Sequence, residues 1–133
     1  GEDSGIYVDA FPGELGVKTR RFRELHAATD EEWVKYFLKE MEIVPDGKRG
    51  AQFVCHAVLV LSGEPFYFHG ETSGVITRTL EASIIPGIPL SSCFRPDGFN
   101  KVYSALAPEE KNQISHRGKA IAGVRDFLRP YLA

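Results

Sequence analysis

Two short segments of this chain combine residue types that could carry out chemistry, and they lie far apart in the sequence. The first contains Glu2 and Asp3, adjacent carboxylates that precede an apolar stretch. Carboxylate oxygens are the ligands that Mg²⁺ prefers, and a metal or a carboxylate can activate a water molecule for attack. The pair could therefore form a metal site or a general base, although acidic residues near a terminus are usually just solvated.

The second segment is the basic run Lys111-Asn-Gln-Ile-Ser-His-Arg-Gly-Lys119. Ser115 is a good helix-capping residue, which places His116 and Arg117 in the first turn of the helix that follows. Exposed amides and the positive end of the helix dipole favour electron-rich ligand atoms there. Basic side chains run against the usual preference for acids in a first turn, so helix stability does not explain them. They either bind such a ligand or form a solvated face with Lys119.

The composition is that of a globular protein of one domain. The chain has 133 residues, of which 43% are hydrophobic and 26% charged. Domains cluster at roughly 100–150 residues, and this hydrophobic content argues against disorder. We therefore expect a single domain over residues 1–133.

Charge and hydropathy argue against two classes of partner. The balance of 16 Lys+Arg against 18 Asp+Glu gives a net charge of −2, without the basic excess of a nucleic-acid binder. No apolar run approaches the ~20 residues of a membrane span, and the first residues lack a signal peptide's layout. Cys55 and Cys93 are too few for a disulfide framework and indicate buried thiols in a cytoplasmic protein. His26, His56 and His69 show no ligand spacing, and we expect them to be structural or exposed.

The first third of the chain predicts a strand, a loop and a helix. Alternation over residues 5–11 indicates a strand that Pro12-Gly13 ends, and residues 13–28 read as a loop. Thr29-Asp-Glu-Glu32 has the pattern of a capping box. An apolar stripe at helical spacing follows and predicts a core-facing helix over 30–42. Its members are Trp33, Val34, Phe37, Leu38 and Met41.

The middle of the chain predicts an antiparallel hairpin. After a turn at Pro45-Asp-Gly47, residues 51–61 are almost continuously apolar, which is typical of a central strand buried on both faces. Ser62-Gly-Glu-Pro65 reverses the chain, and a second strand begins at residues 66–69. We expect a further, separate strand over residues 74–77.

The last third predicts a loop and two helices. Residues 82–100 are rich in proline and glycine and read as a structured loop. Pro108 suits the first turn of a short helix over 108–114. A last helix from Ser115 carries Ile121, Val124, Leu128 and Leu132 on one face. Helices on both sides of a strand-rich middle predict an α/β or α+β domain, with a mixed sheet around a long central strand over 51–61 and flanking helices.

Taken in order, these segments resemble the non-canonical purine nucleoside triphosphate pyrophosphatases, the inosine triphosphate pyrophosphatase family. Glu2-Asp-Ser-Gly-Ile6 is similar to the family's E-D-[ST]-G-L, and Arg49-Gly-Ala-Gln-Phe53 to its R-x-A-x-F. Gly70, Gly74 and Ile76 match G-x-x-x-G-x-I. Ile114-Ser-His-Arg-Gly-Lys-Ala120 matches the late signature almost letter for letter and is the most specific piece. The likeness extends over the whole chain.

The resemblance implies a reaction and a site. Family members convert a nucleoside triphosphate and water to the monophosphate and pyrophosphate with Mg²⁺, and they prefer ITP, dITP and XTP. Asp3 matches the carboxylate that activates water, and Glu2 and Asp3 match the metal end of the site. The implied substrate-binding residues are Ser4, Gly5, Lys111, Ser115, His116 and Arg117. The resemblance also implies a homodimer that binds a free nucleotide.

The base preference that the resemblance implies has a physical basis. Inosine and xanthine carry a 6-keto acceptor where adenine carries a 6-amino donor. Lys111, His116 and Arg117 match the lining of the base pocket, and cationic donors near that edge favour the keto bases. An unmet pairing in a desolvated pocket is costly, which rejects the wrong base.

The chain departs from the family pattern in two places. The family's T-x-N-x-x-K segment, which holds the triphosphate, has no counterpart in residues 1–133. The family's F-G-Y-D-P-I-F loop aligns with Ile88 to Phe94, so Ile88 takes the base-stacking position and Ser91 the acidic one. We expect feeble hydrolysis by this chain alone. The alternative is a catalytically silent nucleotide-binding or dimerisation module of the same fold.

Overall fold

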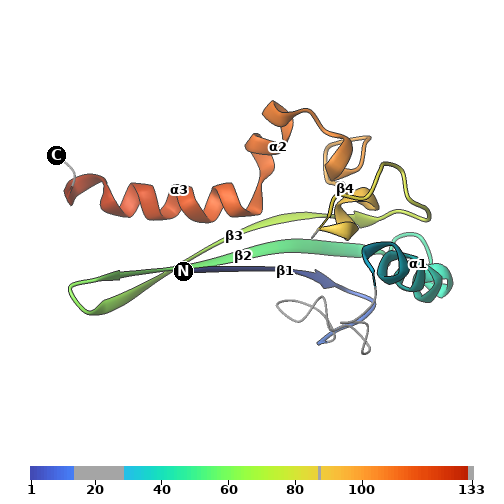
Figure 1. Ribbon diagram of the computed structural model, residues 1–133, viewed down its shortest axis with the longest axis horizontal. Coiled ribbons are helices and arrows are strands. Elements are labelled where there is room, and N and C mark those ends of the chain that lie inside the picture. Colours follow the sequence, from blue (N-terminus) through green and yellow to red (C-terminus); the bar gives the residue numbers. More distant parts are fainter. Residues whose placement is uncertain (14–28, 87, 132–133) are drawn as a thin grey trace.

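The described residues form an α/β structure built on a four-stranded antiparallel sheet. The computed structural model describes residues 1–13, 29–86 and 88–131, and Figure 1 shows their arrangement. The strand order is β1-β2-β3-β4. The strands are β1 (Glu2–Val8), β2 (Gly50–Leu61), β3 (Glu64–Ile76) and β4 (Phe94–Pro96). The long central strand and the flanking helices are as predicted, whereas all described strand pairs are antiparallel rather than mixed.

A long hairpin of β2 and β3 forms the centre of the sheet. Leu61 pairs with Glu64 and Gly50 with Val75. The two-residue turn has positive φ at Ser62 (53°) and Gly63 (80°), the geometry that matches the twist of a hairpin. β3 is one strand, so the prediction of a separate strand over 74–77 was wrong. Gly74 lies inside β3, where β4 approaches closely. A Cβ at this position would come within 2.8 Å of the Phe94 ring of β4, so the position requires glycine.

Strand β1 lies at one edge of the described sheet, antiparallel to β2. It begins at Glu2, opposite Ala57, and ends at Val8, opposite Ala51. The predicted strand over 5–11 was therefore displaced by three residues along the chain. The length of β2 explains the shift, because it offers partners as far as Ala57. The predicted loop over 13–28 lies outside the described residues from residue 14 onward.

Side chains alternate between the two faces of the sheet, and only one face carries the described helices. Glu2, Ser4 and Ile6 of β1 share a face with Phe53, Cys55 and Ala57 of β2. Helix α3 (His116–Leu128) lies over β2 and β3 on this face, which we call the helix face (Figure 1). The prediction that 51–61 is buried on both faces holds only near Phe53–Cys55, since Val60 is 66% exposed.

Helix α1 (Asp30–Glu40) closes the core at the other end of the sheet (Figure 1). The capping box is present: Glu32 N donates to Thr29 Oγ1 at 3.1 Å, and Thr29 N donates to Glu32 Oε1 at 3.0 Å. A 3₁₀ turn over Met41–Ile43 follows the helix. The predicted stripe is core, since Trp33, Val34, Phe37 and Met41 are buried and Leu38 packs against them.

The C-terminal third holds short elements and two helices. Residues 82–100, predicted as a loop, contain the 3₁₀ turn η3 (Pro89–Ser92) and β4. Helix α2 (Pro108–Ile114) matches its prediction. Helix α3 packs on the sheet through Ala120, Gly123 and Val124, so Val124 is the member of the predicted stripe that the core contacts confirm. Small residues beside it let the helix approach the sheet closely, and Gly123 meets Phe68. Ile121 is exposed, and Leu132 lies outside the described residues.

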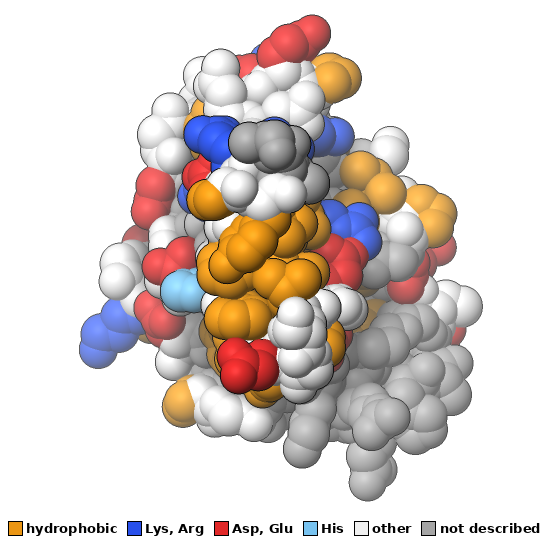
Figure 2. Space-filling model, turned by 90° about the vertical axis from the view of Figure 1, so that its left-hand side faces the viewer, with side chains coloured by type: hydrophobic (Ala, Val, Ile, Leu, Met, Phe, Trp, Pro, Cys, Tyr) orange, Lys and Arg blue, Asp and Glu red, His pale blue; other side chains and the backbone are white. Residues whose placement is uncertain are grey.

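The free end of the hairpin carries a cluster of aromatic side chains, most of which are half-buried. Phe127 of α3 stacks near Phe66 at 4.6 Å, Phe68 at 5.6 Å and Tyr131 at 6.1 Å between ring centroids. Figure 2 views this end and shows hydrophobic side chains gathered at its centre. We call Phe66, Phe68, Phe127 and Tyr131 the end cluster. No helix among the described residues is long and apolar enough to cross a bilayer.

The two cysteines are free and buried, as predicted. Burial raises the pKa of Cys93 to about 12, so that thiol stays protonated and unreactive at neutral pH.

Candidate functional site

A cavity of about 190 Å³ on the helix face brings together segments that are distant in sequence. β1 contributes Ser4, Gly5 and Ile6, and β2 contributes Phe53. The opposite wall comes from residues 88–91 around η3, from Tyr103 of the 3₁₀ turn Tyr103–Ala105 and from His116 of α3. The lining is mostly apolar with a few polar groups, which is the usual character of a small-molecule site.

His116 is a titratable side chain in the lining of this cavity. Its ring stacks on Phe53 with centroids 5.3 Å apart and planes at 24°. Its Nδ1 atom is buried and has no hydrogen-bond partner among the described residues. Burial lowers the pKa of His116, and the adjacent Arg117 charge lowers it further. A neutral imidazole with an unmet buried nitrogen favours a ligand that offers a polar edge.

The start of α3, which positions His116, is fixed by three contacts with β3. Thr72 Oγ1 donates to Ile114 O, and Lys119 Nζ donates to Glu71 O at 2.6 Å. A Cβ on Gly70 would lie 2.6 Å from Lys119 Cβ and 2.7 Å from Ala120 N, so only glycine permits this approach. Ser115 caps α3 as predicted, and its Oγ accepts from Gly118 N at 3.0 Å.

Glu2 and Arg117 form an ion pair on the helix face. Arg117 donates from Nε to Glu2 Oε1 at 2.6 Å and also from Nη2 to the same oxygen. This hydrogen bond holds the pKa of Glu2 below its usual value and raises that of Arg117. Arg117 is not among the residues that line the cavity, although the resemblance implied a place in the base pocket.

Asp3 lies on the opposite face of the sheet from Glu2. It pairs across strands with His56, which in turn pairs with His69, and the two imidazole centroids are 6.1 Å apart. All three side chains are exposed, as expected for the two histidines. The two carboxylates predicted to share a metal ion are therefore not brought together. In the part of the chain that the structure describes, no three His, Cys, Asp or Glu residues are arranged to hold a metal ion.

Some of the predicted site residues line the cavity, others do not, and two lining residues were not predicted. Ser4, Gly5 and His116 meet at the cavity, whereas Lys111 lies in α2 and is not part of its lining. Tyr103 and Phe53 were missed as site residues. Phe53 is the aromatic residue of the R-x-A-x-F match, a signal that could have identified it, whereas no spacing links Tyr103 to the other motifs.

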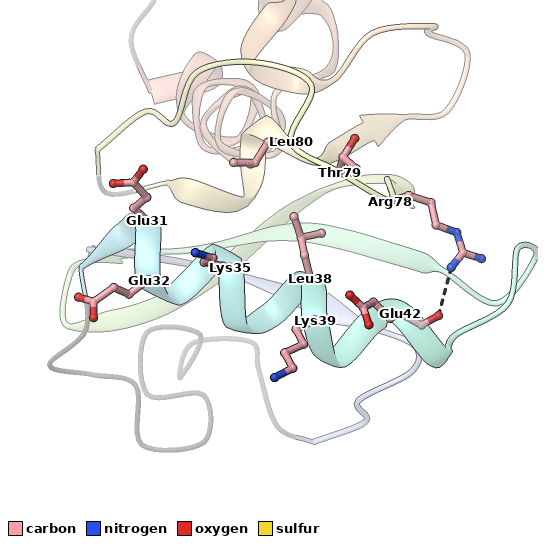
Figure 3. Close-up of a pocket in the computed structure, with 9 residues that line it drawn as sticks. All are labelled: Glu31, Glu32, Lys35, Leu38, Lys39, Glu42, Arg78, Thr79 and Leu80. Carbon is pink, nitrogen blue, oxygen red and sulfur yellow. Dashed lines mark hydrogen bonds between the residues drawn. The ribbon is translucent and has the colours of Figure 1, made fainter.

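A larger hollow of about 880 Å³ lies between α1 and residues 78–80. Figure 3 shows charged side chains of both signs around it, among them Lys35 and Lys39 of α1. Arg78 is already occupied, because its Nη2 pairs with Asp46 at 2.9 Å and its Nη1 donates to Glu42 O at 3.2 Å. None of the predicted catalytic, metal-binding or substrate-binding residues lines this hollow, so the smaller cavity is the better candidate.

Comparison with known proteins identifies the family of the chain. The sequence model of the Ham1 family matches residues 1–127. The chain is 36% identical over 131 residues to the dITP/XTP pyrophosphatase of Yersinia pestis and likewise 36% identical to that of Escherichia coli. Each alignment covers 96% of this chain and 65% of the relative. The chain thus spans somewhat less than two thirds of the length of these relatives.

Solved structures show the same fold. The Ham1 protein of Staphylococcus aureus superimposes with a TM-score of 0.83 at 30% identity, over 98% of this chain and 66% of that one. A nucleoside-triphosphatase, named as a dITP/XTP pyrophosphatase, from Mycobacterium abscessus gives a TM-score of 0.71 at 34% identity, over 96% of this chain and 64% of that one.

Proposed function

Because the chain belongs to the Ham1 family, we propose that this protein hydrolyses non-canonical purine nucleoside triphosphates, such as ITP, dITP and XTP, to the monophosphate and pyrophosphate. The observation that carries the proposal is the mostly apolar cavity that Ser4, Gly5 and His116 line together, although they come from segments distant in sequence. Relatives named dITP/XTP pyrophosphatase support the choice of substrate.

The base would enter the cavity between Phe53 and residues 88–91. Apolar walls from Ile6, Ile88 and Leu90 favour a flat heterocycle, and His116 supplies a polar partner for its edge. A base whose polar edge leaves this nitrogen unmet would forfeit a hydrogen bond in a desolvated place. The backbone of Ser4 and Gly5 runs along the floor of the same cavity.

The reacting phosphates would lie at Asp3. β1 is an edge strand of the described sheet, so a nucleotide can reach around it from the cavity beside Ser4 to the exposed Asp3 carboxylate. Asp3 would accept a proton from the attacking water as the water oxygen joins the α-phosphorus. The bond from that phosphorus to the bridging oxygen breaks, and pyrophosphate leaves with the electron pair.

We propose Mg²⁺ as the metal, with Asp3 as its protein carboxylate. Mg²⁺ sites often use one or two carboxylates together with substrate phosphates, and the exposed Asp3 fits that role. Glu2 does not fit it, because its carboxylate is paired with Arg117 on the other face. When bound, the metal would neutralise phosphate charge.

We further propose that residues 1–133 form one domain and that the protein is a cytoplasmic homodimer. The end cluster supports an interface, because aromatic residues are enriched at such surfaces and Tyr131 is 66% exposed. Light scattering on the purified protein measures the oligomeric state directly.

The experiment that tests the function is pyrophosphate release from ITP, XTP, ATP and GTP with Mg²⁺. We expect turnover of ITP and XTP above that of ATP and its loss in Asp3→Asn, which keeps the shape but removes the base. Asp126→Asn, a matched change at the far end of α3, should leave the rate unaltered. Equal losses in both variants, or no preference for keto bases, would refute the assignment. The runner-up, a silent nucleotide-binding module, is favoured because no described residue places a second carboxylate beside Asp3, and it predicts IMP binding without turnover.

A further inference from the structure

We propose that Glu2 is a positioning residue, which holds the Arg117 guanidinium beside the base-binding cavity, and that it takes no part in binding metal. The inference rests on the proposed function and deepens it, since it assigns base recognition to an ion pair at the start of α3. It also gives two adjacent residues different roles, since Glu2 positions Arg117 and Asp3 is the proposed general base and metal ligand.

Strand geometry sets the two carboxylates apart. Successive side chains of a strand point to opposite faces, and the register puts Glu2 opposite Ala57 and Asp3 opposite His56. Ala57 is buried under α3, whereas His56 is exposed on the other face. A metal bound to Asp3 on that face cannot also use Glu2 without a rebuilt strand.

The Glu2 carboxylate is already occupied on the helix face. Its Oε1 accepts from both Nε and Nη2 of Arg117, and its Oε2 lies 3.9 Å from the thiol sulfur of the buried Cys55. The Glu2 side chain is only 28% exposed, whereas that of Arg117 is 67% exposed. Metal binding here would break the ion pair and leave the guanidinium without this partner.

The pair leaves one part of Arg117 available to a ligand. Nε and Nη2 are used on Glu2, and Nη1 makes no hydrogen bond to any described residue. A long arginine side chain loses rotamer entropy when it is ordered on binding. The ion pair with Glu2 already orders Arg117 in the free protein, so less entropy is lost when the ligand binds. Nη1 can then donate to a keto oxygen of a base whose other edge meets the adjacent His116.

The test separates positioning from metal binding by measuring IMP affinity in EDTA by calorimetry, with no metal present. We expect Glu2→Ala to weaken IMP binding about two- to fivefold, the range that an exposed ion pair supports. Glu2→Gln, which keeps an acceptor oxygen, should recover part of the loss. Glu2→Ala should have no further effect in an Arg117→Ala background. Asp126→Ala, which removes the acid of the Arg129 pair on the same helix, is the matched control and should leave the affinity unchanged.

Kinetics with ITP supply the second readout. We expect Glu2→Ala to raise KM with little change in kcat, and to leave the Mg²⁺ concentration for half-maximal rate where it was. A half-saturating Mg²⁺ concentration raised at least about tenfold, persisting in the Arg117→Ala background, would overturn the inference and make Glu2 a metal ligand. A wild-type protein that neither binds IMP nor hydrolyses ITP would instead refute the proposed function, and this inference with it.

Discussion

Ile88 lines the cavity in which we propose that the base binds. It lies just before η3 and lines the same space as His116 and Phe53. Stacking on an aromatic ring contributes ~1–3 kcal/mol per base. We expect Ile88→Phe to tighten IMP binding by an amount near the lower end of this range, measured by calorimetry.

A matched substitution controls for added aromatic surface. Ile43→Phe makes the same change at a residue that is 88% exposed and remote from the cavity lining, so it should not alter IMP affinity. Unchanged or weaker binding in Ile88→Phe would show that residues 88–91 are not the base platform.

His116 should make stability depend on pH in the neutral to mildly acidic range. Its pKa is lowered in the folded protein because burial disfavours the charged ring, so the unfolded chain binds a proton more readily. The stability from this residue is therefore complete above the unfolded pKa of ~6.5 and declines as the pH falls below it. We expect the urea-unfolding free energy to fall between pH 7.5 and 5.5.

Replacement of the titrating ring isolates its contribution. His116→Phe keeps an aromatic partner for Phe53 and should flatten that part of the pH profile. A profile that stays equally steep in His116→Phe would contradict a neutral, buried imidazole.

At the scale of elements, the approach of α3 to β3 depends on a single missing side chain. A Cβ on Gly70 would collide with the backbone of α3 at Ala120 N and with the Lys119 side chain. Overpacking of this kind typically costs 1–3 kcal/mol. We expect Gly70→Ala to lower the unfolding free energy by about that amount and to weaken IMP binding, because α3 carries His116.

Gly123 of α3, which also lies at the contact between this helix and the sheet, provides the comparison. In Gly123→Ala the new Cβ meets only the Phe68 ring edge at 3.2 Å, and a side chain can yield where backbone cannot. Its cost in denaturant unfolding should be clearly smaller. A Gly70→Ala protein as stable as the wild type would mean that α3 does not pack as closely as described.

Local chemistry explains which elements could be predicted from the sequence. The capping box at Thr29 and Glu32 and the turn at Ser62-Gly63 depend on neighbours in sequence, and both are present. The start of β1 and the continuity of β3 depend on distant partners, β2 and β4. The buried face of α3 was predicted only at Val124 for the same reason, since Ala120 and Gly123 carry no strong hydrophobic signal but allow close contact.

In the candidate site, too, some residues could be predicted from local motifs and others depend on distant parts of the fold. The motifs named Ser4, Gly5 and His116, which do meet, but they could not supply Tyr103, which a separate turn delivers. The opposite directions of Glu2 and Asp3 follow from strand alternation alone, once the strand is known to begin at Glu2. The Glu2–Arg117 pair joins residues 115 positions apart and required the fold.

For the whole molecule, the charge around Asp3 limits what this chain can do with a triphosphate. β1, β2 and β3 contain no lysine or arginine, and the described neighbours of Asp3 across the sheet are His56 and His69. Donors aimed at charge that develops in the transition state are worth ~10²–10³ in rate each. We therefore expect the 133-residue chain to release pyrophosphate from ITP at least ~100-fold more slowly than the Yersinia pestis relative, of which it spans 65%. Fusion of the remaining part of that relative to the chain should raise the rate, and the gain should vanish in Asp3→Asn. Rapid Mg²⁺-dependent turnover by the chain alone would show that its own residues hold the phosphates, and it would remove the electrostatic reason for needing any other segment.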